Sequence, residues 1–126
     1  MKKIIHTSQA PAAVGAYSQA VVFGNTLYVS GQIAIVPETG ELNTRTIEEE
    51  THQVMNNLKA ILEAAGATFD NVLKCSVFAT DMNNFVRINT VYATYFNPEN
   101  APAREFVEVS NLPKFVNVEI SLIAGL

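Results

Sequence analysis

Two short apolar runs near the start of the chain predict a β-hairpin. Residues 21–23 and 27–29 flank Gly24-Asn25-Thr26, a short glycine-containing turn that suits a hairpin connection. Residues 33–42 contain a proline and a glycine, both turn formers, and are predicted to form a loop.

Helical periodicity governs the next segment, for which we predict a helix over residues 46–65. Thr46 and Glu49 match a capping box, in which each side chain satisfies a backbone N–H of the other residue. Gly66 follows at a position where helices commonly end. The apolar residues that recur at helical spacing are Ile47, Val54, Leu58, Ile61, Leu62 and Ala65.

The second half of the chain predicts a strand, a helix and two more strands. Residues 72–80 are rich in β-branched and apolar residues, and Asn83 or Asn84 is expected to cap a second helix that Pro98 ends. Strands are expected over 105–109 and 116–124. The element order β-β-β-α-β-α-β-β predicts an α+β fold, one domain over residues 1–126, with both helices on one face of a sheet.

Two helices leave the other face of such a sheet uncovered, so its composition matters. In the last strand Val116, Val118, Ile120 and Leu122 alternate with Asn117, Glu119, Ser121 and Ile123. In the earlier strand Leu73, Cys75, Val77 and Ala79 alternate with Lys74, Ser76, Phe78 and Thr80. A face of this mixed character suits a subunit interface better than open water, which predicts an oligomer closed by sheet faces.

Composition narrows the classes of protein that the chain can belong to. Cys75 is the only cysteine, which favours a cytoplasmic location, and no apolar run is long enough for a signal or membrane segment. His6 and His52 have no companion at ligand spacing, so we expect no metal site. The net charge of -4 argues against nucleic-acid binding.

Glu119 is the most unusual residue of the last strand. A carboxylate in so apolar a stretch must find a partner or have a raised pKa, which is the condition that general acid–base catalysis needs. The alternative is a structural role, as a charge on an edge strand or as half of an ion pair.

Arg104 is the candidate partner, because Pro102 stiffens the backbone just before a strand begins. Its rigid donor fork fits a carboxylate in bidentate fashion, although a surface salt bridge is the alternative role. A pocket that held both Arg104 and Glu119 would bind a small acid and keep a carboxylate near its reacting carbon.

Three further residues lie where a ligand could approach. Tyr17 is either a hydrogen-bonding wall or a packed aromatic, and Ser30-Gly31 ends the hairpin where backbone amides can be exposed, although such a pair is commonly only a turn. The sequence has no Ser-His-Asp pattern, phosphate-cradling loop or Cys-His pair that would favour covalent catalysis, and Cys75 is interpreted as a buried apolar residue.

In combination these residues resemble the RidA family (YjgF-type proteins, or reactive-intermediate deaminases) from end to end. The first landmarks are Ala10-Pro11-Ala12-Ala13-Val14-Gly15, Tyr17-Ser18-Gln19-Ala20, Ser30-Gly31-Gln32-Ile33 and residues 57–66. The others are Val77-Phe78, Asp81-Met82-Asn83, Asn89, Tyr92, Pro102-Ala103-Arg104, Leu112-Pro113 and Val118-Glu119-Ile120. The resemblance implies a chorismate-mutase-like α+β fold, with a six-stranded mixed sheet, two helices on one face, and a homotrimer around a central β-barrel with clefts between subunits.

The resemblance also implies a deaminase that hydrolyses 2-iminobutanoate and 2-iminopropanoate to 2-keto acids and ammonia without a cofactor. Arg104 would clamp the substrate carboxylate, helped by the amide of Gly31. Glu119 would activate the attacking water and manage the proton on the imine nitrogen. Tyr17, Ser30 and Asn89 would shape the pocket and support the water and the arginine.

Two positions depart from the family pattern. Ala16 stands where many members have proline, which would loosen the loop that carries Tyr17. Phe106 stands where many have cysteine, so its backbone could still serve the substrate site while its ring narrows the cleft. The substrate range is the property that this change would affect.

Two other functions are compatible with the same residues. A non-catalytic trimeric protein that binds small acids and regulates a partner would keep Arg104 as an anchor but would not need Glu119. A ribonuclease or translation inhibitor is an activity attached to relatives, and the acidic balance and the lack of a histidine pair argue against it.

Overall fold

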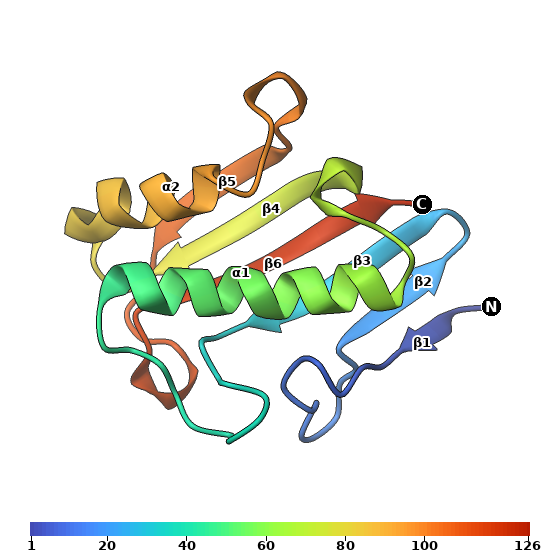
Figure 1. Ribbon diagram of the computed structural model, residues 1–126, viewed down its shortest axis with the longest axis horizontal. Coiled ribbons are helices and arrows are strands. Elements are labelled where there is room, and N and C mark those ends of the chain that lie inside the picture. The colour runs from blue at the N-terminus through green and yellow to red at the C-terminus, as the bar shows by residue number, and fades with distance from the viewer.

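The computed structural model describes residues 1–126 and contains one six-stranded sheet with the strand order β1-β2-β3-β6-β4-β5. All neighbouring strands are antiparallel except β4 and β5, which are parallel. Both long helices lie on the same face of this sheet (Figure 1). The α+β fold with a mixed sheet is therefore confirmed. The strands are β1 (Lys3–Ile5), β2 (Ala20–Phe23), β3 (Thr26–Gln32), β4 (Val72–Ala79), β5 (Ala103–Glu108) and β6 (Val118–Gly125).

Helix α1 (Ile47–Ala64) agrees with the predicted helix to within one residue at each end. Thr46 caps it, since its hydroxyl accepts a hydrogen bond from the amide of Glu49 at 3.0 Å. The expected return bond of the capping box is replaced by a hydroxyl-to-carboxylate contact between the same two residues, at 3.4 Å. At the other end Gly66 has φ of 78°, and the amides of Gly66 and Ala67 donate to Glu63 and Leu62, which closes the helix as a Schellman motif.

Helix α2 (Phe85–Ala93) is shorter than the predicted second helix, which was expected to continue up to Pro98, and it starts differently. Neither Asn83 nor Asn84 caps it through its side chain. Instead Asp81 accepts a hydrogen bond from the amide of Asn83 at 2.9 Å and starts a 3-10 turn that leads into the helix. Pro98 does not end the helix, because it lies five residues after Ala93, at the start of a separate 3-10 turn.

The hydrophobic core lies between α1, α2 and the sheet face that they cover. Its largest fully buried side chains include Leu27, Met55, Leu58, Ile61, Leu62, Ile88 and Ile120. In β6 the alternation is as expected, because Val118, Ile120, Leu122 and Ala124 are buried and the residues between them are partly exposed.

One expectation about the sheet faces was wrong. Leu73 was assigned to the same face as Cys75, but the pairing of β4 with β6 shifts register between Val72 and Lys74, and Leu73 is exposed. A bulge of this kind inserts one residue and so changes which side chains face the core.

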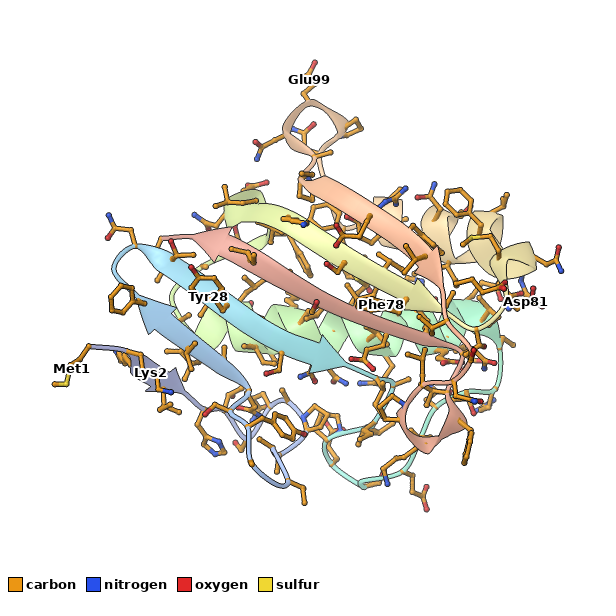
Figure 2. All side chains as sticks on the ribbon, turned by 180° about the vertical axis from the view of Figure 1, so that it is seen from behind. Met1, Lys2, Tyr28, Phe78, Asp81 and Glu99 are labelled. Atoms are coloured by element: carbon orange, nitrogen blue, oxygen red, sulfur yellow. The ribbon has the colours of Figure 1, made fainter.

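The sheet face away from the helices is not covered by any part of the chain, as Figure 2 shows with Tyr28 and Phe78 on it. Tyr28 remains 46% exposed and Phe23 62% exposed. The same face also holds the ion pair between Lys74 and Glu105, at 3.0 Å. No helix in the structure is long and apolar enough to cross a membrane.

Candidate active site

Glu119 lines a cavity of about 520 Å³ on the uncovered side of the sheet. Its neighbour across the strands is Phe78, which also points away from the helices. The carboxylate is half-buried, and this desolvation raises its pKa above the usual value for glutamate. No ion pair or hydrogen bond with another side chain offsets the burial. Glu119 is therefore not half of an ion pair within the chain, which was one of its two alternative structural roles.

Gly31 makes room for this carboxylate. A Cβ atom at position 31 would lie 2.9 Å from Cδ of Glu119 and would overlap its oxygen Oε2. The pairing of β3 with β6 explains the close approach, because Ser30 and Gly31 together oppose one residue, Ser121, in a β-bulge. Gly31 thus gives the Glu119 side chain the space for its observed position, and its sequence signal was the glycine at a strand end.

Two hydrogen bonds from Ser30 hold the loop that carries Tyr17. Its hydroxyl donates to the carbonyl of Ser18 at 2.6 Å, and its amide donates to the carbonyl of Gln19 at 2.9 Å. The buried amide side chain of Gln19 donates in turn to the carbonyls of Thr7 and Pro11, at 3.0 and 2.8 Å. Tyr17 lines the Glu119 cavity and is 53% exposed, so it is a wall of the cavity and not a packed aromatic.

Arg104 lies elsewhere, on the edge strand β5 beside α2. Its Nη1 donates to Oδ1 of Asn89 at 2.6 Å, and its guanidinium lies 5.0 Å from the ring centre of Tyr92. Both partners belong to α2, so this helix fixes the direction of the guanidinium. Arg104, Asn89 and Tyr92 line a second cavity, of about 430 Å³.

Tyr92 also reaches inward toward Cys75. Its hydroxyl is buried without a hydrogen-bond partner, and burial raises the pKa of this phenol. Cys75 is fully buried and its pKa is likewise raised by desolvation. The thiol is therefore in the inert state that was expected for a small buried apolar residue.

The ring of Phe106 lies against the guanidinium of Arg104. Its ring lies 4.6 Å from that of Phe85 and 5.6 Å from the guanidinium of Arg104. It is absent from the lining of either cavity described above. Within one chain, its side chain therefore does not narrow a cleft.

A single chain does not bring Arg104 and Glu119 together. Arg104 pairs with Cys75 of β4, whose side chain is in the core, whereas Glu119 pairs with Phe78, whose side chain faces the other way. The two charged groups thus project from opposite faces of the sheet into separate cavities. The expectation of one pocket holding both is not met within one copy of the chain.

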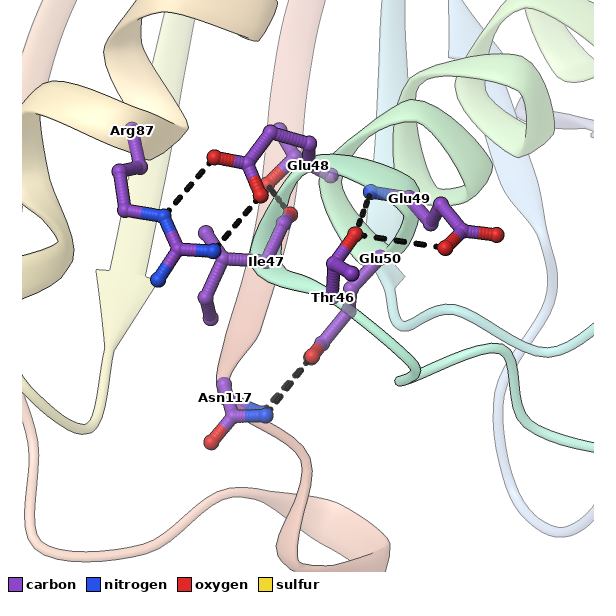
Figure 3. A network of polar contacts seen from close by, with 8 residues as sticks. Thr46, Ile47, Glu48, Glu49, Glu50, Arg87 and Asn117 are labelled. Carbon is purple, nitrogen blue, oxygen red and sulfur yellow. Dashed lines mark hydrogen bonds and ion pairs between the residues drawn. The ribbon is translucent and has the colours of Figure 1, made fainter.

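Sequence reasoning missed two charged residues near the Glu119 cavity. Lys114, in the turn before β6, lines the cavity itself. Glu50 is fully buried in the first turn of α1, where its carboxylate accepts hydrogen bonds from the amides of Asn117 and Val118 and from the side chain of Asn117 (Figure 3). Glu50 lies on the apolar stripe of the predicted helix, three residues after Ile47, and that position was the available signal.

Proteins with similar sequences belong to one family. The family model described as Endoribonuclease L-PSP matches residues 7–126. A RutC family protein of Pyrococcus horikoshii is 52% identical, over 98% of each chain. The rat protein named 2-iminobutanoate/2-iminopropanoate deaminase is 48% identical, over 98% of this chain and 90% of its own.

Solved structures of similar proteins have the same fold as this chain. A member of the conserved Rid protein family from Yersinia pestis, YyfA, superimposes with a TM-score of 0.97 at 48% identity, over all of both chains. E. coli TdcF, solved with bound serine, gives a TM-score of 0.92 at 41% identity, over 98% of each chain. The chain belongs to the Endoribonuclease L-PSP family, the YjgF/RidA family that its motifs resemble.

Proposed function

We propose that the chain is a deaminase that hydrolyses small 2-imino acids to 2-keto acids and ammonia, in sites formed between copies of the chain. The observation that carries this proposal is the half-buried Glu119, unpaired and with a raised pKa, against Gly31 in an open cavity. A carboxyl group whose pKa is raised holds a proton more readily than an ordinary glutamate, so it is suited both to accept a proton and to return it.

The reaction needs little more than such a group and a means of orienting the substrate. The reaction begins from the protonated imine: water adds to its carbon as Glu119 takes one of the water's protons, which gives a neutral tetrahedral amino alcohol. Glu119 then returns this proton to nitrogen, and the C–N bond breaks as ammonia leaves. The hydroxyl group releases its proton to Glu119 or solvent as its oxygen becomes the keto oxygen. The imine is already electrophilic, so orientation and one acid–base group supply the catalysis.

Orientation requires a cation that binds the substrate carboxylate, and Arg104 suits this role. Its guanidinium is held by Asn89 and by aromatic rings, which leaves further donors of the fork for a ligand. Because one chain separates Arg104 from Glu119, we infer that a second copy supplies the arginine. The uncovered sheet face, with its exposed aromatic residues, is a surface that such an assembly would bury. The trimer that the family resemblance implies is one arrangement that meets this need.

The names of relatives support the same choice. The rat and mouse proteins named as 2-iminobutanoate/2-iminopropanoate deaminases are 48% and 45% identical to this chain. Serine bound to E. coli TdcF is a small carboxylic acid that also carries an amino nitrogen on the neighbouring carbon.

The test couples a threonine dehydratase to the protein and follows decay of the released imine by trapping with semicarbazide. The wild-type protein should suppress the trapped imine, whereas Arg104→Ala and Glu119→Gln should not. Arg87→Ala is the matched control, because Arg87 is an exposed arginine of α2 that pairs with Glu48 and lines neither cavity. Imine that decays at its spontaneous rate with every protein would reject the deaminase.

That rejection would favour the non-catalytic protein that binds small acids. Such a protein should bind 2-keto acids, and its binding should depend on Arg104 but not on Glu119. The family description raises ribonuclease activity as the other candidate. Neither cavity holds a histidine, and the net charge is -4, so nothing in the two cavities favours it.

A further inference from the structure

The Glu119 cavity contains two charged residues, Glu119 and Lys114. Lys114 belongs to the turn Pro113–Phe115, which leads directly into β6. The other residues that line the cavity are apolar or uncharged, among them Tyr17, Ser30 and Gln32. A basic group is therefore available in the same cavity as the proposed acid–base residue.

Lys114 has no acidic partner within the chain. The three ion pairs of the structure use Arg45, Lys74 and Arg87 as their cations. The exposed ammonium of Lys114 is thus free to attract an anion that enters the cavity.

The backbone at this turn is strained. Lys114 and Phe115 have φ of 55° and 56°, in the left-handed region that residues with a Cβ atom avoid. The turn is held by hydrogen bonds from the amides of Phe115 and Val116 to the carbonyls of Leu112 and Pro113, at 2.9 and 3.3 Å. Strained backbone of this kind persists only where the surrounding structure enforces it, and it is enriched at functional sites. At this turn it places Lys114 at the cavity.

We propose that Lys114 makes the site selective for 2-imino acids whose side chain carries a second carboxylate. This inference rests on the proposed deaminase, in which Arg104 of a second copy binds the carboxylate next to the imine. With that group bound and the imine carbon beside Glu119, Lys114 can bind a carboxylate at the far end of the substrate. Such imines arise when a flavin or nicotinamide enzyme oxidises an acidic amino acid at its α-carbon.

The experiment compares two imines made in place by amino-acid oxidases, 2-iminoglutarate from glutamate and 2-iminopropanoate from alanine. The readout is the ratio of kcat/KM for the dicarboxylate to kcat/KM for the monocarboxylate, measured by semicarbazide trapping. Lys114→Met should lower this ratio about tenfold, the value of one charge-assisted hydrogen bond. Lys114→Arg should keep most of it. Lys59→Met removes an exposed lysine of α1 and is the matched control, which should leave the ratio unchanged.

Three results would overturn the inference. A ratio that is the same in Lys114→Met and in wild type would remove the role of Lys114, as would wild-type protein that hydrolyses 2-iminopropanoate but not 2-iminoglutarate. Both of these leave the deaminase standing. Wild-type protein that accelerates the decay of neither imine would reject the proposed function together with the inference.

Discussion

At the scale of single residues, the proposed chemistry depends on how closely Glu119 and Gly31 approach each other. The carboxylate occupies space that a side chain at position 31 would fill, and the β-bulge at Ser30 and Gly31 creates this space. The sequence singles out Glu119 by its apolar neighbours, but no local pattern shows that Gly31 lies against it. Their proximity in the fold gives Glu119 its half-buried environment and raised pKa.

Substitution of Gly31 by alanine tests this proximity. The new Cβ atom should displace the carboxylate of Glu119, and a displacement of this size lowers catalysis by about a hundredfold. Gly125→Ala is the control, since its Cβ would make an ordinary contact, 3.5 Å from Leu73. The rate of imine hydrolysis is the measurement, and full activity in Gly31→Ala would show that Glu119 tolerates the shift.

The raised pKa of Glu119 gives a second prediction. The residue accepts a proton from water only when ionised, so kcat/KM should fall as pH decreases through its pKa. Because desolvation raises this pKa, the fall should occur at a higher pH than is usual for glutamate. Glu119→Gln should remove most of the activity, and the remaining kcat/KM should no longer fall at low pH. A rate that stays constant down to the ordinary pKa of glutamate would contradict the assignment.

The same shift predicts an effect on stability. Above the pKa of Glu119 in the folded protein, this residue is ionised in both the folded and the unfolded wild-type chain. Only the folded chain holds the charge partly away from water, which destabilises the folded state. Glu119→Gln should therefore raise the free energy of unfolding at neutral pH. This gain should disappear as the pH falls below the ordinary pKa of glutamate, where both proteins are neutral at this position. Urea unfolding at several pH values measures it, and a gain independent of pH would point to a different cause.

At the scale of elements, α1 and β6 are tied together by Glu50. Its buried carboxylate satisfies the two amides at the start of β6 and the side chain of Asn117 (Figure 3). This contact holds the start of β6, which lies one residue before Glu119. The ion pair of Arg87 with Glu48 joins α2 to the same end of α1, and it lowers the pKa of Glu48 to about 2.

Glu50→Ala should leave these three donors unsatisfied in the protein interior. We expect a loss of about 2–4 kcal/mol in the free energy of unfolding. Glu49→Ala, which removes only a surface contact with Thr46 and Arg45, should cost below about 1 kcal/mol. Urea unfolding of both variants is the measurement, and equal losses would show that the network of Glu50 contributes nothing of its own.

Elements whose signals are local were predictable from the sequence, and contacts between distant elements were not. The helix over 46–65 has a cap and a periodic face within its own residues, and a glycine directly after them. The face of Leu73 and the cap at Asp81 were missed because a bulge and a 3-10 turn depend on pairing and packing. The separation of Arg104 from Glu119 follows from the register of β4 with both neighbours, which no local pattern contains.

At the scale of the whole molecule, one copy of the chain keeps the two halves of the proposed site apart. One cavity contains Glu119, the proposed acid–base residue, and the other contains Arg104, which is expected to bind the substrate carboxylate. The uncovered sheet face presents exposed apolar residues, among them Ile4, Phe23, Tyr28 and Val107. Assembly of copies would bury such a face and could bring the two kinds of cavity together.

The central claim, that the site combines Arg104 of one copy with Glu119 of another, is tested most directly by mixing two inactive variants. Arg104→Ala and Glu119→Gln chains, unfolded together and refolded in equal amounts, should form hybrids in which some sites have both native residues. Random assembly with one arginine donor and one glutamate donor at each site predicts recovery of about a quarter of wild-type activity. Separately refolded variants should stay inactive. A refolded mixture as inactive as its components would contradict a site shared between copies.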